Sequence, residues 1–183
     1  MPHDHNFDFM TVGYHGSGYR TEIYEYDYDR VCGYPGEKID LRFLENTRLG
    51  RGKVMFYRKS KDVHIQHPPE SLSISLNLML RCPNQHTRQQ YEFDIEQSRI
   101  KNFLSGDISL RVSIIEMAAE LGGVASLEIL DEISRKHACE RSRKAAFTGL
   151  LRSPHYDGQI AFRNLKSDAS PIVRQLLENI QHV

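Results

Sequence analysis

The chain has 183 residues, no tryptophan, and 24 basic against 24 acidic side chains. A chain of this length buries roughly 70% of its unfolded surface when it folds, so neither disulfides nor an obligatory partner is needed to build a core. The balanced charge argues against a nucleic-acid-binding protein held by bulk electrostatics, because such proteins usually carry a clear basic excess.

The sequence favours a cytoplasmic protein. No apolar run approaches the ~20 residues of a membrane helix, and the first five residues resemble no signal peptide. Cys32, Cys82 and Cys139 are odd in number, far apart and without a C-x-x-C pair. That pattern is typical of free thiols in a reducing compartment. We therefore expect neither a membrane nor a nucleic acid among the partners.

Residues 1–95 have the pattern of a β domain, in which aromatic and β-branched runs are separated by Gly, Pro and Asn. The stretch Gly13–Gly18 lies between two such runs and predicts a hairpin turn whose glycines take positive φ. Many short strands without a long helix predict an antiparallel barrel or sandwich. The expected strands are 5–14, 19–27, 37–44, 52–58, 61–66, 71–80 and 88–95.

Residues 96–183 change to a hydrophobic period of about 3.6, which predicts a second, α-helical domain and an α+β chain. Pro154 and Gly158 leave Tyr156–Phe162 open as a helix or a loop. The expected helical segments are Arg99–Leu104, Ile108–Leu121, Ala125–His137, Arg141–Leu151 and Pro171–Ile180.

An arginine followed by apolar residues recurs at Arg111, Arg143 and Arg174, in steps of 32 and 31 residues. Between the first two copies, Leu121–Leu130 resembles the turn and second helix of HEAT-like repeats. The resemblance covers about residues 107–181. It implies helix pairs stacked into a small solenoid, whose concave face would hold a protein partner. An ordinary helical bundle is the alternative.

Histidines in the β domain point to a metal site. Residues two apart in a strand share a face, so His3 and His5 present both imidazoles to one side. By the same parity His64 shares a face with Asp62 and Gln66. If the two strands line one interior, three imidazoles converge where a divalent metal ion can bind with positions left open. His15 and His67 are expected to be solvated loop residues.

The pattern His3-x-His5 with Gly16 after it, followed by Gly52–Tyr57 leading to His64, resembles the two halves of the cupin metal-binding pattern. The resemblance covers about residues 1–80. Proteins of that family are small β-barrels in which histidines and a glutamate hold iron, manganese, zinc, nickel or copper. For this chain the resemblance implies His3, His5 and His64 as the metal ligands, with iron favoured.

The sequence departs from that pattern at the glutamate, where Phe9 or Met10 stands instead. Asp8 is the nearest carboxylate, although in a regular strand it faces away from His3 and His5. Asp62 and Gln66 share the parity of His64 and are the candidates to orient or complete the site.

Two classes of function follow. The first is a cupin-like, iron-dependent oxygenase that acts on a small molecule. The second is a non-catalytic ligand-binding or interaction module whose helical repeats hold a protein partner. No nucleophile motif such as G-x-S-x-G occurs, so the enzyme interpretation depends on the metal.

Overall fold

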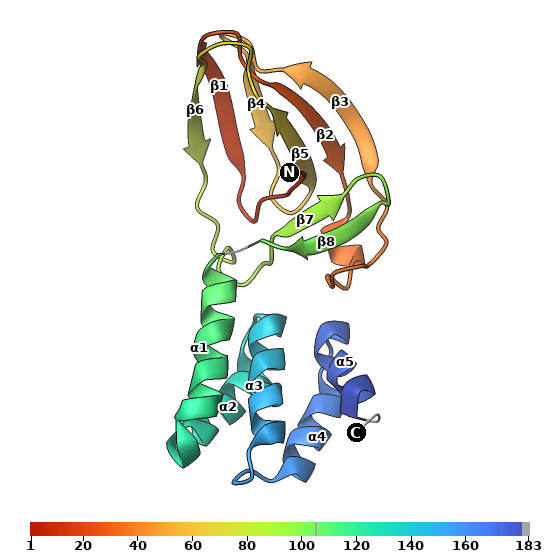
Figure 1. Ribbon diagram of the computed structural model, residues 1–183, viewed down its shortest axis with the longest axis vertical. Helices are drawn as coiled ribbons and strands as arrows, with labels where there is room; N and C mark the ends of the chain where they lie inside the picture. The colour runs from red at the N-terminus through yellow and green to blue at the C-terminus, as the bar shows by residue number, and fades with distance from the viewer. Residues whose placement is uncertain (105, 181–183) are drawn as a thin grey trace. The chain divides into compact units, whose positions relative to one another are not determined.

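The computed structural model describes residues 1–104 and 106–180, and the chain divides into two compact units, Met1–Leu104 and Ser105–Val183. Within the described residues the chain is α+β. Eight strands in three small antiparallel sheets form the first unit, and five α-helices form the second (Figure 1). No helix in the described ranges combines the length and the apolar composition that a membrane span requires.

The strands of the first unit form two three-stranded sheets and one hairpin. The first sheet has the order β4-β1-β6, the second β3-β2-β5, and the hairpin joins β7 to β8. The elements are β1 (Phe9–His15), β2 (Arg20–Glu25), η1 (Tyr28–Arg30), β3 (Arg42–Arg48), β4 (Val54–Tyr57), β5 (Asp62–His67), β6 (Ile74–Met79), β7 (Tyr91–Asp94) and β8 (Arg99–Phe103).

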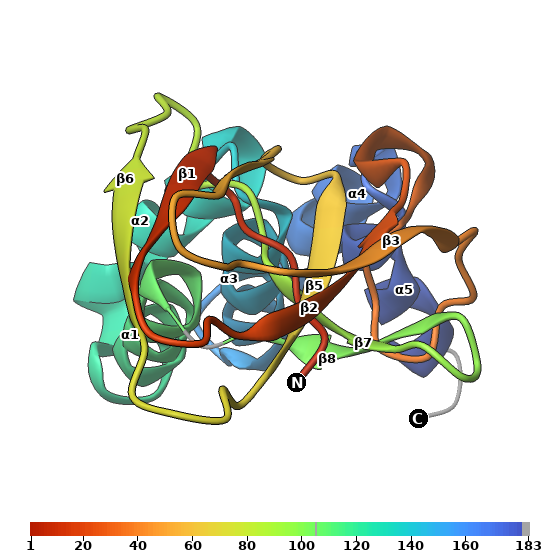
Figure 2. The same cartoon turned by 90° about the horizontal axis from the view of Figure 1, so that it is seen from above.

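The two three-stranded sheets pack against each other through alternate, inward-facing side chains. Phe9, Met55 and Tyr57 of the first sheet form one buried cluster with Ile23 of the second sheet and Leu49. In both views β1 and β6 lie on one side of this unit and β2 and β3 on the other (Figures 1 and 2). The sheets of the described chain therefore enclose a core but do not close into a barrel.

The stretch Gly13–Gly18 forms a turn but not the predicted hairpin. Gly16 and Gly18 have positive φ, as expected. However, β1 pairs with β4 and β6, whereas β2 pairs with β3 and β5, so the turn carries the chain from one sheet to the other. A Cβ atom at Gly18 would lie 2.0 Å from the carbonyl oxygen of Leu49. The glycines are therefore required by a close crossing of two backbone segments.

Each of the seven expected strands overlaps an observed one, but the prediction of a helix at Arg99–Leu104 is wrong. Residues Arg99–Phe103 are β8, which pairs with β7 from Asp94↔Arg99 to Tyr91↔Phe103. Ile100 lies in the core of this unit. Because this strand completes a hairpin, the first unit ends at Leu104 rather than near residue 95.

The second unit is built around α3, which contacts each of the other four described helices. Ala145, Ala146 and Leu150 of α3 form its core with Ile115 and Leu130. The helices are α1 (Asp107–Leu121), α2 (Gly123–Lys136), α3 (Glu140–Arg152), α4 (Gly158–Ser167) and α5 (Pro171–Ile180).

The segment left open as a helix or a loop begins α4. Asp157 caps this helix by accepting hydrogen bonds from the backbone N–H groups of Gln159 and Ile160. The recurrent arginines Arg111, Arg143 and Arg174 lie in alternate helices, α1, α3 and α5.

Candidate metal centre

The N-terminal segment brings the three histidines together because it lies between β5 and β7. His3 forms an antiparallel bridge with His64 of β5 and another with Glu92 of β7. The backbone N–H of His3 donates to the carbonyl of His64 at 3.2 Å, and that of His64 donates back at 3.0 Å. Residues paired in this way have side chains on the same face, and His5 lies two positions further along that face.

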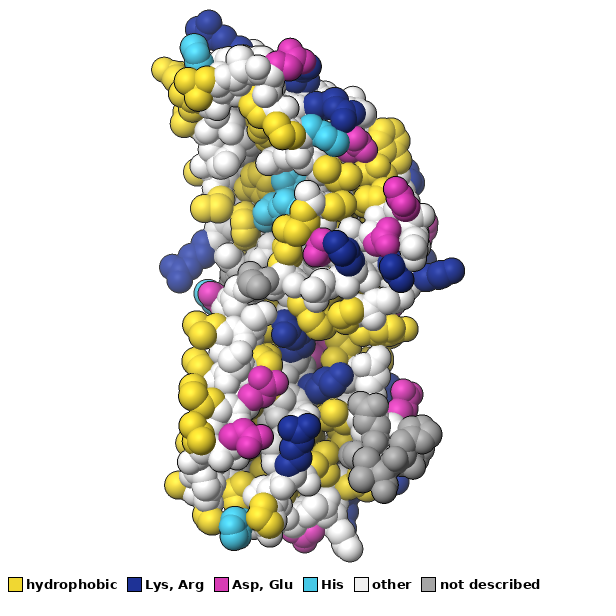
Figure 3. All heavy atoms as spheres, viewed as in Figure 1, with side chains coloured by type: hydrophobic (Ala, Val, Ile, Leu, Met, Phe, Trp, Pro, Cys, Tyr) yellow, Lys and Arg dark blue, Asp and Glu magenta, His cyan; other side chains and the backbone are white. Residues whose placement is uncertain are grey.

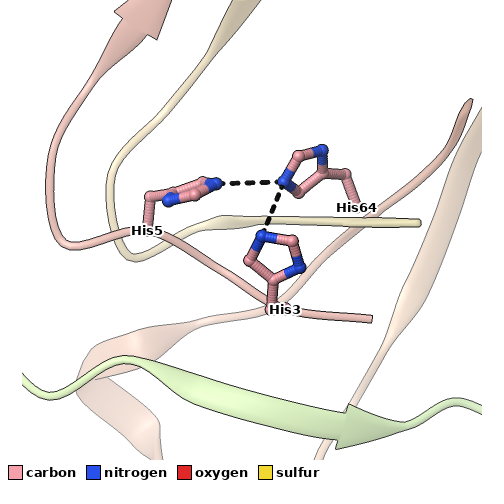
Figure 4. Close-up of side chains that lie close together, drawn as sticks. All are labelled: His3, His5 and His64. Carbon is pink, nitrogen blue, oxygen red and sulfur yellow. Dashed lines mark hydrogen bonds between the residues drawn. The ribbon is translucent and has the colours of Figure 1, made fainter. Parts of the chain in front are cut away.

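All three imidazoles turn their Nε2 atoms toward one point (Figure 4). The Nε2 atom of His64 lies 3.0 Å from Nε2 of His5 and 3.2 Å from Nε2 of His3. The three ligand atoms lie within 4.8 Å of one another, and they are the only such group in residues 1–104 and 106–180. His64 is buried, whereas His3 and His5 are half-buried. Figure 3 shows that histidine side chains reach the surface of this unit.

Aromatic rings hold two of the imidazoles in place. The ring centroid of His5 lies 4.9 Å from that of Phe7 and 4.8 Å from that of Phe9. The ring of His64 lies 4.8 Å from that of Tyr57, which stacks on Phe9. These contacts restrict the imidazoles, so that little conformational freedom remains to be lost when they bind an ion.

The same burial keeps these two imidazoles neutral. Burial, followed by the nearby charges of His3 and His5, lowers the pKa of His64 to about 3. Burial, followed by the charge of His3, lowers the pKa of His5 to about 4. Metal ligation requires a neutral imidazole, and at neutral pH both residues have lost the extra proton that would prevent it.

The hydrogen bonds of the group leave nitrogen lone pairs unsatisfied. The Nδ1 atom of His3 lies 3.0 Å from the carbonyl oxygen of Met1, which requires a proton on Nδ1 and leaves a lone pair on Nε2. The Nε2 atom of His64 has one proton or one lone pair, yet it faces two nitrogens. A cation at the centre would engage three lone pairs at once, which no arrangement of protons achieves.

Asp4 fixes the segment between His3 and His5 and was not singled out from the sequence. Its carboxylate is fully buried on the opposite face, where one oxygen accepts from the Tyr26 hydroxyl and the other from the Tyr91 N–H, each at 2.7 Å. Burial outweighs these bonds and raises the pKa of Asp4 to about 7. The alternation His3-Asp4-His5 was the available signal, because a strand that presents both histidines on one face must turn Asp4 inward.

None of the three residues proposed to orient the site is hydrogen-bonded to the imidazoles in the described chain. Asp62 accepts from the backbone N–H of Arg58 at 2.7 Å and from its guanidinium, because the two residues flank the turn between β4 and β5. Asp8 accepts from the Lys59 N–H at 2.7 Å, and Gln66 is exposed.

The residue that approaches the group is instead Gln90. Its Nε2 atom lies 3.4 Å from Nδ1 of His5 and 3.2 Å from the carbonyl oxygen of Asp4. His67 lies outside the histidine group, and its Nε2 atom is 2.9 Å from Oε1 of Glu22. His15 is exposed.

Comparisons of the chain with protein-family models, with curated proteins and with solved structures find no match. The function is therefore inferred from the geometry of the three histidines.

Proposed function

We propose that His3, His5 and His64 bind one divalent metal ion, and that the protein is a cupin-like, iron-dependent oxygenase of a small molecule. The observation that carries the proposal is the convergence of three Nε2 atoms. Imidazole nitrogens that bind one ion at 2.0–2.1 Å in tetrahedral geometry lie about 3.3 Å apart. The separations of 3.0 and 3.2 Å from His64 are close to that value before any ion is added.

The donor set narrows the choice of metal. Three neutral nitrogens without a carboxylate suit zinc, copper, iron or nickel better than magnesium or calcium, which prefer oxygen. Three protein ligands leave positions for other molecules, which is typical of catalytic rather than structural sites. Iron in such a site would supply the redox chemistry with which dioxygen oxidises a small molecule.

A non-catalytic binding module is the second candidate, and one feature of the helical unit favours it. Leu110, Ile114, Met117 and Leu121 are exposed at helical spacing along α1. Figure 3 shows hydrophobic side chains gathered along α1. Such a stripe suits an apolar protein partner.

Oxygen consumption separates the two candidates. The metal-free full chain is loaded with Fe(II) without air, and dioxygen uptake is then measured against a panel of small organic acids, amines and phenols. The oxygenase proposal predicts uptake above the Fe(II) blank with at least one compound, lost in His64→Ala and kept in His67→Ala. Stoichiometric iron binding without uptake across the panel favours the binding module.

A further inference from the structure

We propose that the outer face of the sheet β4-β1-β6 is the interface of a homodimer of this chain. Two complete rows of cross-strand neighbours cover this face, and all their side chains are apolar. We call these six residues the apolar sheet face; they are Met10, Phe56 and Leu78 in one row and Val12, Val54 and Leu76 in the other.

The opposite face of β1 and β4 already has a partner. Phe9, Met55 and Tyr57 point inward and form the core with Ile23 of β2. Side chains alternate along a strand, so the residues between them must point outward. Five of the six members of the apolar sheet face are between 42 and 62% exposed, and Val12 is half-buried.

The second sheet of the unit shows what a solvated outer face looks like in this protein. There, Arg20 of β2 is flanked by Arg48 and His67. The next outward residue, Glu22, contacts Arg20 at 3.4 Å and His67 at 2.9 Å. The second sheet thus presents charged pairs to water around Arg20 and Glu22, whereas the two rows of the apolar sheet face contain only apolar side chains. A contiguous apolar face of this kind marks an interaction surface.

The size of the face fits one half of a dimer interface. Apolar side chains continue at every second position on either side of the two rows, in Ile74 of β6 and in Leu72 and Leu80 next to it, which are 44, 78 and 47% exposed. At roughly 100 Å² for each half-exposed large side chain, these residues and the apolar sheet face together present about 800 Å². A standard interface buries about 800 Å² per partner, whereas the largest patch on a typical monomer is roughly 300–600 Å².

The chemistry of the face selects a second copy as its occupant. A two-fold interface brings a patch against itself, so a charge near the symmetry axis meets its own copy. The apolar sheet face has no charged member and therefore pairs with itself without that penalty. Homodimer interfaces are also more apolar than those of transient complexes.

Sedimentation analysis of the full chain tests the proposal. The wild type should be a dimer with a dissociation constant of about 1 µM or lower. The double variant Leu76→Lys/Leu78→Lys should raise that constant at least 100-fold, because it places two like charges on each side of the interface. Both positions are exposed, so circular dichroism should show unchanged secondary structure.

The matched control is Ile114→Lys/Met117→Lys on α1, where the replaced side chains are 52 and 55% exposed. It should leave the dissociation constant within about twofold. A wild type that stays monomeric up to about 100 µM would overturn the proposal, whatever the variants do. The proposal would also be overturned if Ile114→Lys/Met117→Lys made the dimer dissociate while Leu76→Lys/Leu78→Lys had no effect. That result would assign the interface to the helical unit.

Discussion

Asp4 is the residue on which the position of the histidines depends. Its buried carboxylate is bonded to Tyr26 and to the backbone of β7, and the Asp4 N–H donates to the Tyr91 carbonyl at 3.3 Å. These three bonds hold the backbone on either side of Asp4, and with it both His3 and His5.

Removal of one of these bonds should loosen the site. In Tyr26→Phe one oxygen of a buried carboxylate loses its partner, which should lower the free energy of unfolding by about 2 kcal/mol. Zinc affinity should fall several-fold, because His3 and His5 are then held less firmly. Urea unfolding and zinc titration check both values. The control is Tyr14→Phe at an exposed tyrosine, and equal losses in the two variants would contradict the account.

Strand parity predicted that His3 and His5 share a face, and the cupin resemblance implied His64 as the third member of the group, but the neighbours of the three histidines could not be predicted. Parity relates His3 to His5 and depends only on local sequence. The approach of Gln90 and the bonds of Asp4 to Tyr26 and Tyr91 join residues 22 to 87 positions apart. They follow from the insertion of the N-terminal segment between β5 and β7, for which the sequence carries no local signal.

At the scale of elements, the predictions that were wrong concern short segments. The five residues of β8 contain too few apolar positions to separate a period of 2 from one of 3.6, so pairing with β7 decides their conformation. Similarly, the glycine turn after β1 predicted positive φ correctly. It did not reveal that β1 and β2 belong to different sheets, because turn residues specify a local backbone shape and not the partner of each strand.

A half-buried ion pair joins α3 to the connection between α4 and α5. Arg143 donates two hydrogen bonds to the Asp168 carboxylate, at 2.8 and 3.0 Å. Burial by itself would raise the pKa of the Asp168 carboxyl. Hydrogen bonds from Arg143 and from the Ser170 N–H, together with the charges of Arg143 and Arg174, outweigh that effect. The pKa of Asp168 is therefore below its usual value. A carboxyl with a lowered pKa stabilises the fold above the unfolded pKa near 4 and loses that contribution as pH falls further.

Asp168→Asn should therefore lower the free energy of unfolding of the helical unit by about 2 kcal/mol at pH 7. The difference from wild type should shrink as pH falls from 4 toward 2, because the wild-type carboxyl then also becomes neutral. Urea unfolding followed by the helical circular dichroism signal measures both. Glu132→Gln, which breaks an exposed pair with Lys136, should cost less than about 0.5 kcal/mol. A difference for Asp168→Asn that is independent of pH would contradict this assignment.

At the scale of the whole molecule, the change of pattern along the chain predicted an α+β protein with β structure first and helices second. The molecule's two compact units differ in what they offer. The strand unit contains the histidine group and the apolar sheet face, and the helical unit contains the exposed stripe of α1. Binding of a metal ion should thus be a property of the strand unit alone.

The most direct test of the metal centre is equilibrium dialysis of the metal-free full chain against Zn²⁺, which binds imidazole and has no redox chemistry of its own. We predict one ion per chain with a dissociation constant of about 1 µM or lower, and at least 100-fold weaker binding in His64→Ala. His67→Ala, in the same strand but bonded to Glu22, should bind like the wild type. Equal binding by wild type and His64→Ala, or no binding by the wild type at about 100 µM, would contradict a three-histidine metal centre.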